Sequence, residues 1–378
     1  MARTESPAGS PGSAPEPHGP AEAEIRTVAH AAVPGEPPGR PQRTAPQERT
    51  PQEPASGESA PPPRPRPRWG DRTGRWRRGL VLTALALLVA LLMVSHAHIP
   101  NAVGNLGSLA ETFLPWAGLA LPVLLGAALW RRSCTALIGV LVPLLVWLNL
   151  FGGLLLDKTA DGGDLMLATH NVDAGNPDPA ATAGELAASG ADVLALQEIP
   201  QHQVATYERE LAGAYPHHAV QGTVGLWSRY PLDDVRPVDI GLGWVRAMRA
   251  TVSAPDGDLA VYVAHLPSVR VQLRAGFTAG RRDDAADLLG LAIAAEPLER
   301  VVLLGDLNGT MNDRALAPVT SQLRSTQGAA GAGFGFTYPA GFPLTRIDHI
   351  LVRGLEPVTS WTLPATGSDH RPVAARVE

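Results

Sequence analysis

Long apolar stretches and short apolar runs divide the chain into regions with different hydrophobic patterns. Three stretches, at about 80–97, 109–130 and 135–156, are almost free of charge, and each approaches the ~20 residues that a helix needs to cross a bilayer. Buried core helices are the ordinary alternative, but three such stretches in quick succession favour membrane spans. A cleaved signal peptide is disfavoured, because the first stretch lies far along the chain and lacks a small-residue cleavage pattern. We predict three transmembrane helices within residues 80–157.

Residues 159–378 instead combine short apolar runs with helical patterns and are long enough for one sizeable domain. The strand-like runs are LMLATHN, DVLALQE, VGLWS, VRAMRATVS, LAVYVAHL, RVVLLGD, RIDHILV and VTSWTL. Helical patterns lie at about 181–189, 201–212 and 277–295. No internal repeat or linker interrupts the region. The mixture predicts an α/β or α+β layered fold in which helices bury the central strands.

Residues 1–79 are rich in Pro, Gly, Ala, Ser, Glu and Arg and hold almost no large apolar residue before Trp69. Such a composition cannot bury enough surface to offset the entropy of ordering the chain. We predict a disordered tail. The run PPPRPRPR favours a locally extended conformation, and a docking site for a proline-recognising partner is the less favoured reading.

The arginines predict the orientation of the three spans. Basic residues crowd the entrance to the first stretch at Arg68, Arg72, Arg75, Arg77 and Arg78. The connector SHAHIPNAVGNLGS has no Lys or Arg, whereas the link between the second and third stretches begins with two arginines, in RRSC. By the positive-inside rule, the tail is cytoplasmic and the region after Lys158 lies outside the cytoplasm. The absence of cysteine from that region agrees with export.

Polar side chains stand at the ends of several predicted strands. They are Asn171, Glu198, His265, Asp306 and Asn308 after strands, and Asp348, Asp369 and His370 at or before strand starts. In a sheet with antiparallel pairs, the end of one strand lies beside the start of its neighbour, so both sets can share one rim. Taken singly, each residue has an ordinary reading as a turn, a cap or a satisfied core group. Together they have the composition of a divalent-metal phosphoesterase site.

Three of these residues suit a metal ion. Mg²⁺ takes a few well-placed oxygen ligands and keeps waters, which fits Glu198 with help from Asn171 or Asp369. We expect Mg²⁺, with Mn²⁺ as a substitute.

The remaining polar residues suit the other needs of phosphate ester hydrolysis. A group must orient and deprotonate water, and donors must neutralise charge that grows on the phosphoryl oxygens. We assign the first role to Asp306 and the second to His265, His370 and Asn308. Asp348 can hold one histidine in the required tautomer and charge state.

The segments THNV, LQEI, VAHL, GDLN, RIDHIL and GSDHRPV stand in the order of the signature segments of the endonuclease/exonuclease/phosphatase superfamily. The resemblance covers the whole region after the spans and implies a four-layer αββα sandwich of the DNase I type, with the metal site at one end of the paired sheets. It implies metal-site positions for Asn171, Glu198 and Asp369. It further implies a water-activating and phosphate-contacting pair at Asp306 and Asn308, and phosphate-facing histidines at His265 and at His370 with Asp348. Histidine rather than tyrosine at position 265 resembles the DNase I and phosphatase branches.

Charge disfavours nucleic acid as the substrate. Residues 158–378 contain 17 basic and 25 acidic residues, a net charge of −8, whereas most nucleic-acid binders have a basic footprint. Arg281 and Arg282 can clamp a second phosphate of a pyrophosphate. A solvated helix start with Arg–Asp pairs is an equal alternative for this pair.

The three spans, an outward domain and the segment GFGFTYPAGFP resemble actinobacterial membrane proteins linked to teicoplanin-type glycopeptide resistance. That resemblance implies a substrate among undecaprenyl-linked cell-wall intermediates. The alternatives are a surface nuclease, a phospholipid or sphingomyelin phosphodiesterase, and a non-catalytic envelope-binding module. The expected partners are membrane lipids and a lipid-linked phosphate, and no protein partner is predicted.

Overall fold

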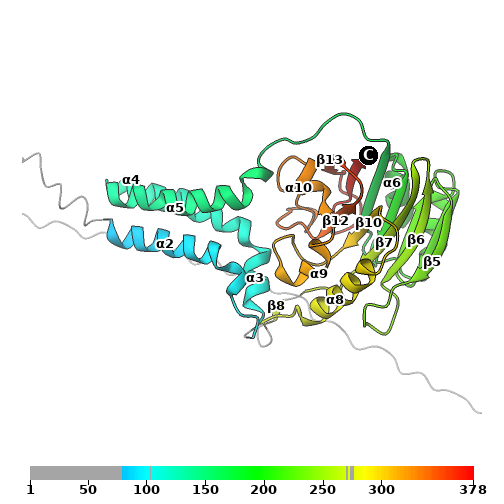
Figure 1. Cartoon of the computed structure of the whole chain (residues 1–378), viewed down its shortest axis with the longest axis horizontal. Helices are drawn as coiled ribbons and strands as arrows, with labels where there is room; N and C mark the ends of the chain where they lie inside the picture. Colours follow the sequence, from blue (N-terminus) through cyan, green and yellow to red (C-terminus); the bar gives the residue numbers. More distant parts are fainter. Residues whose placement is uncertain (1–78, 103, 270, 273–275) are drawn as a thin grey trace, which may run out of the picture. The chain divides into compact units, whose positions relative to one another are not determined.

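A computed structural model describes residues 79–378 except 103, 270 and 273–275 (Figure 1). The tail that we predict to be disordered, residues 1–79, lies outside the described residues apart from Gly79. All described residues belong to one compact unit, Pro67–Glu378.

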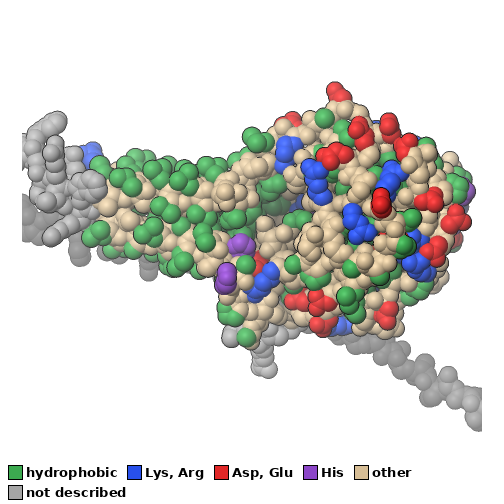
Figure 2. Space-filling model, in the orientation of Figure 1, with side chains coloured by type: hydrophobic (Ala, Val, Ile, Leu, Met, Phe, Trp, Pro, Cys, Tyr) green, Lys and Arg blue, Asp and Glu red, His purple; other side chains and the backbone are tan. Residues whose placement is uncertain are grey.

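The apolar region folds into three main helices: α2 (Leu80–Val94), α4 (Ala120–Trp130) and α5 (Cys134–Phe151). Shorter helices connect them or follow them: η1 (His96–His98), α3 (Leu106–Thr112), η2 (Leu114–Leu119) and η3 (Gly152–Leu154). Large apolar side chains are exposed along all three main helices, among them Val81, Val123 and Leu145 at 74%, 71% and 65%. Figure 2 shows hydrophobic side chains along the helical part of the molecule, whereas most Asp, Glu, Lys and Arg side chains in view lie on the other part.

These helices differ in part from the three predicted spans. Cys134–Leu154, with 21 residues and a mean hydropathy of 2.2, is the one described helix that by length and composition alone can cross a membrane. The second predicted span is instead two segments, Leu106–Thr112 and Leu114–Trp130, with a 67° bend between them. Pro115, at the start of η2, favours the break, because it lacks the N–H that would continue the hydrogen bonds of α3. The first, Leu80–Val94, has only 15 residues.

The rest of the chain forms two six-stranded sheets. One has the strand order β13 (Pro357–Thr362), β14 (Val373–Val377), β1 (Leu165–Asn171), β2 (Val193–Gln197), β4 (Val224–Ser228) and β3 (His217–Gln221). The other has the order β11 (Arg324–Ser325), β12 (Asp348–Arg353), β10 (Val301–Asp306), β7 (Gly257–His265), β6 (Ala247–Ala254) and β5 (Leu232–Pro237). A separate ribbon pairs β8 (Val271–Gln272) with β9 (Gly276–Phe277).

Helices cover the outer faces of both sheets, so the domain has four layers. One core cluster joins the facing sides of the two sheets, for example Leu167 and Val193 with Val263 and Ile350. On the outer face of the first sheet lie α6 (Pro179–Ala188) and α7 (Val204–Leu211). On the outer face of the second lie α8 (Gly280–Ala294), η4 (Arg314–Leu316) and α9 (Ala317–Thr320), while the short α10 (Thr326–Ala330) packs near β12 and β13. The layered α/β prediction and the αββα arrangement implied by the resemblance are confirmed.

All eight strand-like runs fall on strands, and the three helical patterns fall on α6, α7 and α8. The sequence pattern did not predict the two-residue strands β8, β9 and β11, nor β3 and β5, with sequences HHAVQ and LDDVRP. Strands β3 and β5 are both edge strands whose residues are half-buried or exposed. An edge strand needs no continuous apolar run, which is why the pattern did not reveal them.

Candidate active site

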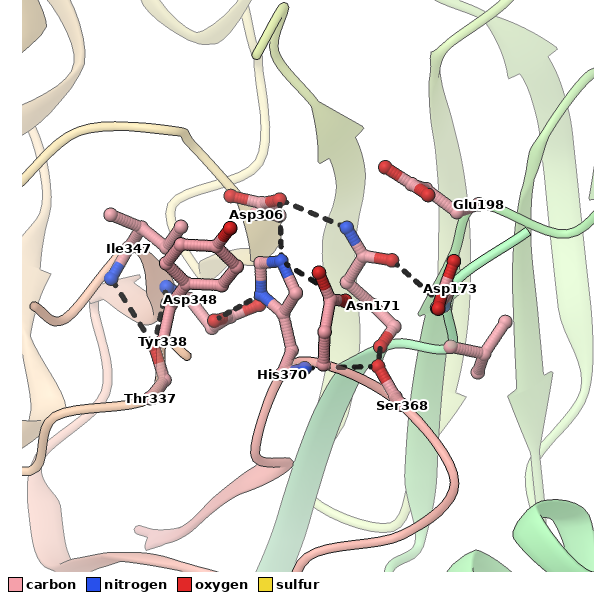
Figure 3. Close-up of polar contacts among 12 residues, drawn as sticks. Asn171, Asp173, Glu198, Asp306, Thr337, Tyr338, Ile347, Asp348, Ser368 and His370 are labelled. Carbon is pink, nitrogen blue, oxygen red and sulfur yellow. Dashed lines mark hydrogen bonds and ion pairs between the residues drawn. The ribbon is translucent and has the colours of Figure 1, made fainter. Parts of the chain in front are cut away.

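Strand pairing places the predicted site residues at one rim. β10 runs parallel to β7 and antiparallel to β12, and the register sets Asp306 opposite both His265 and Asp348. In the facing sheet, Asn171 ends β1 and Glu198 directly follows β2. Figure 3 shows the side chains of Asn171, Glu198, Asp306, Asp348 and His370 converging between the two sheets. The shared rim that the strand ends predicted is therefore present.

Gly305 allows this convergence. A Cβ at position 305 would lie 1.9 Å from the main-chain oxygen of Ala264, its register partner on β7. Any side chain would push β10 away from β7, and with it Asp306 away from His265.

Asp306 lies at the centre of the site and is 1% exposed. Its Oδ2 accepts hydrogen bonds from Asn171 Nδ2 at 3.0 Å and Asn308 Nδ2 at 3.1 Å, and its Oδ1 accepts the main-chain N–H of Asn308 at 2.9 Å. Burial, together with the nearby Asp348 carboxylate, raises the pKa of Asp306 to about 7. A carboxyl poised near neutral pH can take a proton from water.

His370 and Asp348 form a buried ion pair. His370 Nδ1 lies 2.9 Å from Asp348 Oδ2, and His370 Nε2 lies 3.8 Å from Asp306 Oδ2. Burial lowers the pKa of His370, but the Asp348 and Asp306 carboxylates outweigh it and raise the pKa to about 10. Burial raises the pKa of Asp348, but the charge and hydrogen bond of His370 outweigh burial, so the pKa of Asp348 is lowered. The imidazole is therefore a fixed cation directed at the centre of the site.

His265, in contrast to His370, is uncharged. Its Nε2 lies 3.3 Å from Glu198 Oε1 and 3.7 Å from Asp306 Oδ2. Burial, helped by the charges of Arg246 and His370, holds the pKa of His265 well below its usual range. His265 is therefore neutral, and its ring can donate one hydrogen bond and accept another.

Arg246 is a site residue that the sequence did not reveal. Its guanidinium contacts the His265 ring and stacks on Trp244 at 5.1 Å from the ring centroid. Arg246 precedes β6 and reaches the site because its main-chain oxygen accepts the N–H of His265 on the neighbouring antiparallel strand. A single arginine at the start of a strand gives no indication in the sequence that its side chain will contact the site.

Two site residues adopt a left-handed backbone conformation. Glu198 has φ +61° and Asn308 has φ +47°, which costs a non-glycine residue roughly 1 kcal/mol or more. Hydrogen bonds hold both: Ala174 N–H donates to Glu198 Oε2 at 3.3 Å, and Asn308 Nδ2 donates to Leu266 O at 3.0 Å. Such strain is typical of functional sites.

A cavity of about 410 Å³ opens over these side chains. Glu198, Asp306, Asn308, Asp369 and His370 line one part of it, together with the loop that carries Tyr338 and Leu344. Thr112 and Phe113, at the bend between α3 and η2, line another part. The apolar helical region therefore supplies part of the wall of the candidate site.

The structure does not place Arg282 in this cavity. Its side chain is fully buried and forms ion pairs of 2.7 Å with Asp283 and with Asp313. It also donates to the main-chain oxygen of Asn308 at 3.0 Å. The phosphate clamp proposed from the sequence does not fit Arg282, because its donors are committed to these partners. Arg281 is exposed and does not line the cavity.

The donor set fits a hard divalent cation. Glu198, Asn171, Asp306 and Asp369 offer oxygens at the rim, and Asp369 is about half exposed, at 55%. Asp306, Asp348 and His370 also lie close enough, within 4.8 Å, to hold an ion. In that second set His370 Nδ1 is committed to Asp348. The acids of the first set, Glu198, Asp306 and Asp369, do not all come within that distance of one another, but their oxygens are the ligand type that a hard cation prefers.

A family model described as the endonuclease/exonuclease/phosphatase family matches residues 168–370. Among solved structures, the chain is similar to a mannosyl-6-phosphatase of Bacteroides thetaiotaomicron, at 17% identity and a TM-score of 0.47, over 57% of this chain and 100% of the other. It is similar to a humanized D. rerio TDP2 at 19% identity and a TM-score of 0.47, over 57% and 98%. A conserved protein of unknown function from Enterococcus faecalis matches at 17% identity and a TM-score of 0.46, over 57% and 99%. No curated protein matches the chain.

Proposed function

The chain belongs to the endonuclease/exonuclease/phosphatase family, and from that premise we propose that it is a membrane-anchored, metal-dependent phosphoester hydrolase. Its catalytic domain acts outside the cytoplasm on a lipid-linked cell-wall phosphate or pyrophosphate. The role in the cell is turnover of such an intermediate, with a contribution to glycopeptide resistance.

One observation supports a lipid substrate above the other phosphoesters that the family cleaves. The cavity over Asp306 and His370 is walled in part by Thr112 and Phe113, which belong to the apolar helical region. A phosphate in this cavity thus lies beside the apolar Phe113 side chain, at the end of the helical region. An acidic domain without a basic footprint also favours this substrate over nucleic acid.

The roles of the side chains follow from their charge and position. Glu198, with Asn171 and Asp369, would hold Mg²⁺, which when bound neutralises phosphate charge and favours ionisation of water. Asp306 orients the attacking water and accepts its proton, because burial keeps the pKa of Asp306 near neutral. The His370 cation, fixed by Asp348, neutralises charge that grows on the phosphoryl oxygens. Asn308, whose amide donates to Asp306 Oδ2 and to Leu266 O, holds the Asp306 carboxylate in place. Neutral His265 donates a further hydrogen bond beside Glu198.

Membrane anchoring rests on the apolar helices. Cys134–Leu154 is long enough to span, and the bent pair Leu106–Thr112 and Leu114–Trp130 is a broken span under this proposal. The arginines before Leu80 and at Arg131 and Arg132 then face the cytoplasm, which leaves the catalytic domain outside.

The test uses the full-length chain in detergent micelles with Mg²⁺. Undecaprenyl pyrophosphate, a glycerophospholipid, sphingomyelin and duplex DNA are offered separately, and released phosphate or cleaved ester is measured. We expect metal-dependent turnover of the lipid pyrophosphate above the others and none with Glu198→Gln. Faster cleavage of DNA or of a phospholipid would overturn the substrate proposal. Absence of any metal-dependent turnover would overturn the enzymatic function.

A further inference from the structure

An apolar groove of about 380 Å³ lies next to the catalytic cavity. Its walls come from η2 and α4, from α5, and from the loop that carries Phe334 and Phe336. Among the described residues, no charged side chain lines it. The groove joins the apolar helices to the catalytic domain.

The aromatic walls are fixed in place by hydrogen bonds from both indole nitrogens. Trp116 Nε1 donates to the main-chain oxygen of Leu344 at 2.8 Å, and Trp147 Nε1 donates to that of Pro115 at 2.9 Å. The only polar atom of each indole side chain is thereby satisfied, so the walls offer apolar surface alone. Gly118 lets Trp147 approach, since a Cβ at position 118 would lie 2.5 Å from Trp147 Nε1.

The segment GFGF forms the opposite wall. Phe334 and Phe336 stack with centroids 5.1 Å apart, and Phe336 stacks on Trp116 at 5.7 Å. Gly335 between them has φ +59°, and a Cβ there would lie 2.4 Å from Arg346 Nη1. Glycine therefore allows both rings to lie on the same side of the loop.

A third cavity separates the groove from the catalytic cavity and shares wall residues with each. This third cavity, of about 270 Å³, shares Thr112 with the catalytic cavity and shares Pro115, Phe334 and Phe336 with the groove. Leu344 lines the catalytic cavity and accepts the hydrogen bond from Trp116, which lines the groove. The three cavities thus lie next to one another, from Asp306 and His370 to an uncharged, aromatic surface.

We propose that this groove binds the hydrocarbon chain of a lipid phosphate whose phosphate occupies the catalytic cavity. The charged phosphate suits the catalytic cavity, which is lined by charged side chains, and a single linear hydrocarbon chain suits the uncharged groove. The proposal rests on the proposed function, and it identifies chain length as a feature of the substrate that the protein recognises. Substrate selection therefore depends on residues outside the αββα domain as well as inside it.

The test compares farnesyl pyrophosphate with dimethylallyl pyrophosphate, which share a head group and differ only in prenyl length. Leu144→Trp places a large side chain in the groove from α5. Leu145→Trp is the matched control, since Leu145 is 65% exposed on the same helix and does not line the groove. Both variants are measured as full-length chains in detergent with Mg²⁺, alongside the wild type.

We expect wild-type kcat/KM for the farnesyl substrate to exceed that for the dimethylallyl substrate by at least roughly thirtyfold, because each buried methylene contributes about fourfold and burial of about two to three of the additional carbons gives about this factor. Leu144→Trp should lower the farnesyl value by about tenfold, mainly through KM, and leave the dimethylallyl value unchanged. Leu145→Trp should change neither. Equal wild-type values for the two substrates, or equal effects of the two variants, would overturn the proposal.

If the wild type hydrolyses neither compound, the proposed function fails and calorimetric binding of farnesyl pyrophosphate decides on the groove. Weaker binding to Leu144→Trp than to Leu145→Trp then supports the groove independently of catalysis. Equal binding to the two variants overturns it.

Discussion

His370 directs Nδ1 to Asp348 at 2.9 Å and Nε2 to Asp306 at 3.8 Å, so one ring joins two buried carboxylates. Asp348 contacts only the far side of the ring, which leaves Nε2 for a phosphoryl oxygen. Asp348 thus orients His370 as an aspartate orients the histidine base of a catalytic triad, except that here the histidine ring serves as a fixed cation.

Asp348→Asn should lower kcat by about a hundredfold, because the amide leaves His370 without its counter-charge and with the wrong ring orientation. KM should change much less. The measurement is steady-state turnover of a phosphate ester at saturating Mg²⁺. Asp287→Asn, which removes an exposed carboxylate on α8, is the control. Near-wild-type turnover of Asp348→Asn would show that the pair has no role in catalysis.

Glu198→Gln should lower kcat by at least roughly a hundredfold and raise the Mg²⁺ concentration needed for half-maximal activity. Loss of one anionic oxygen weakens the metal site without changing the fold, which circular dichroism should confirm. Chelation should abolish wild-type activity, and added Mg²⁺ should restore it. An unchanged Mg²⁺ requirement in the variant would place the metal elsewhere. Asp306→Asn is the comparison, and it should lower kcat to a similar extent through loss of the base.

Glu296→Gln should destabilise the domain by about 3 kcal/mol, because Arg249 would stay buried without its main partner. Arg249 pairs with Glu296 through two contacts of 3.0 and 3.1 Å, and the two side chains are 4% and 0% exposed. The measurement is the free energy of unfolding in denaturant. Glu356→Gln is the control, since its pair with Arg324 is exposed and should contribute under about 1 kcal/mol.

The same pair predicts a pH dependence. Burial raises the pKa of Glu296, but hydrogen bonds from Arg249 and Tyr262 outweigh it, so the folded-state pKa lies below the ordinary value of 4.5. A lowered carboxyl pKa adds stability that is complete above the unfolded pKa and is lost as the pH falls through the folded pKa. The stability difference between wild type and Glu296→Gln should thus stay constant near neutral pH and shrink in acid below 4.5. A difference that grows on acidification would contradict this.

Arg282→Met should lower stability and reduce turnover of a lipid pyrophosphate and of a simple phosphodiester by the same factor. The reason is that Arg282 holds Asp313 and the main chain at Asn308 and does not reach the substrate. Arg281→Met, at the exposed neighbour, should change neither. A selective loss on the pyrophosphate would restore the clamp predicted from the sequence.

Orientation can be tested by thiol labelling in intact cells. Cys134 is exposed and is the only cysteine of the chain, so it is first replaced by serine. A cysteine introduced at Ser253 in the catalytic domain should then react with a membrane-impermeant reagent, and one introduced within residues 1–60 should not. The reverse labelling would overturn the orientation.

Much of the fold and the site could be predicted from the sequence because the signals are local. The run VVLLGD identified a buried strand, and strand-end positions alone brought Asp306 and His265 to one rim, since sheet pairing aligns strand ends. The edge strands β3 and β5 gave no such signal, because half-exposed strands lack an apolar pattern. The second predicted span, which hydropathy counted as continuous, is bent by 67° just before Pro115.

The amino-acid sequence by itself determined the chemistry of the rim: which carboxylates, amides and histidines stand at strand ends, and the family to which they belong. Only the tertiary structure decided their charge states. The sequence gives no reason to assign different charges to His265 and His370. In the fold, burial beside Arg246 makes His265 neutral, whereas two carboxylates keep His370 charged. Packing also decided that Arg282 is buried and that Phe113 reaches the catalytic cavity. These outcomes depend on contacts between residues far apart in the chain, which no local pattern encodes.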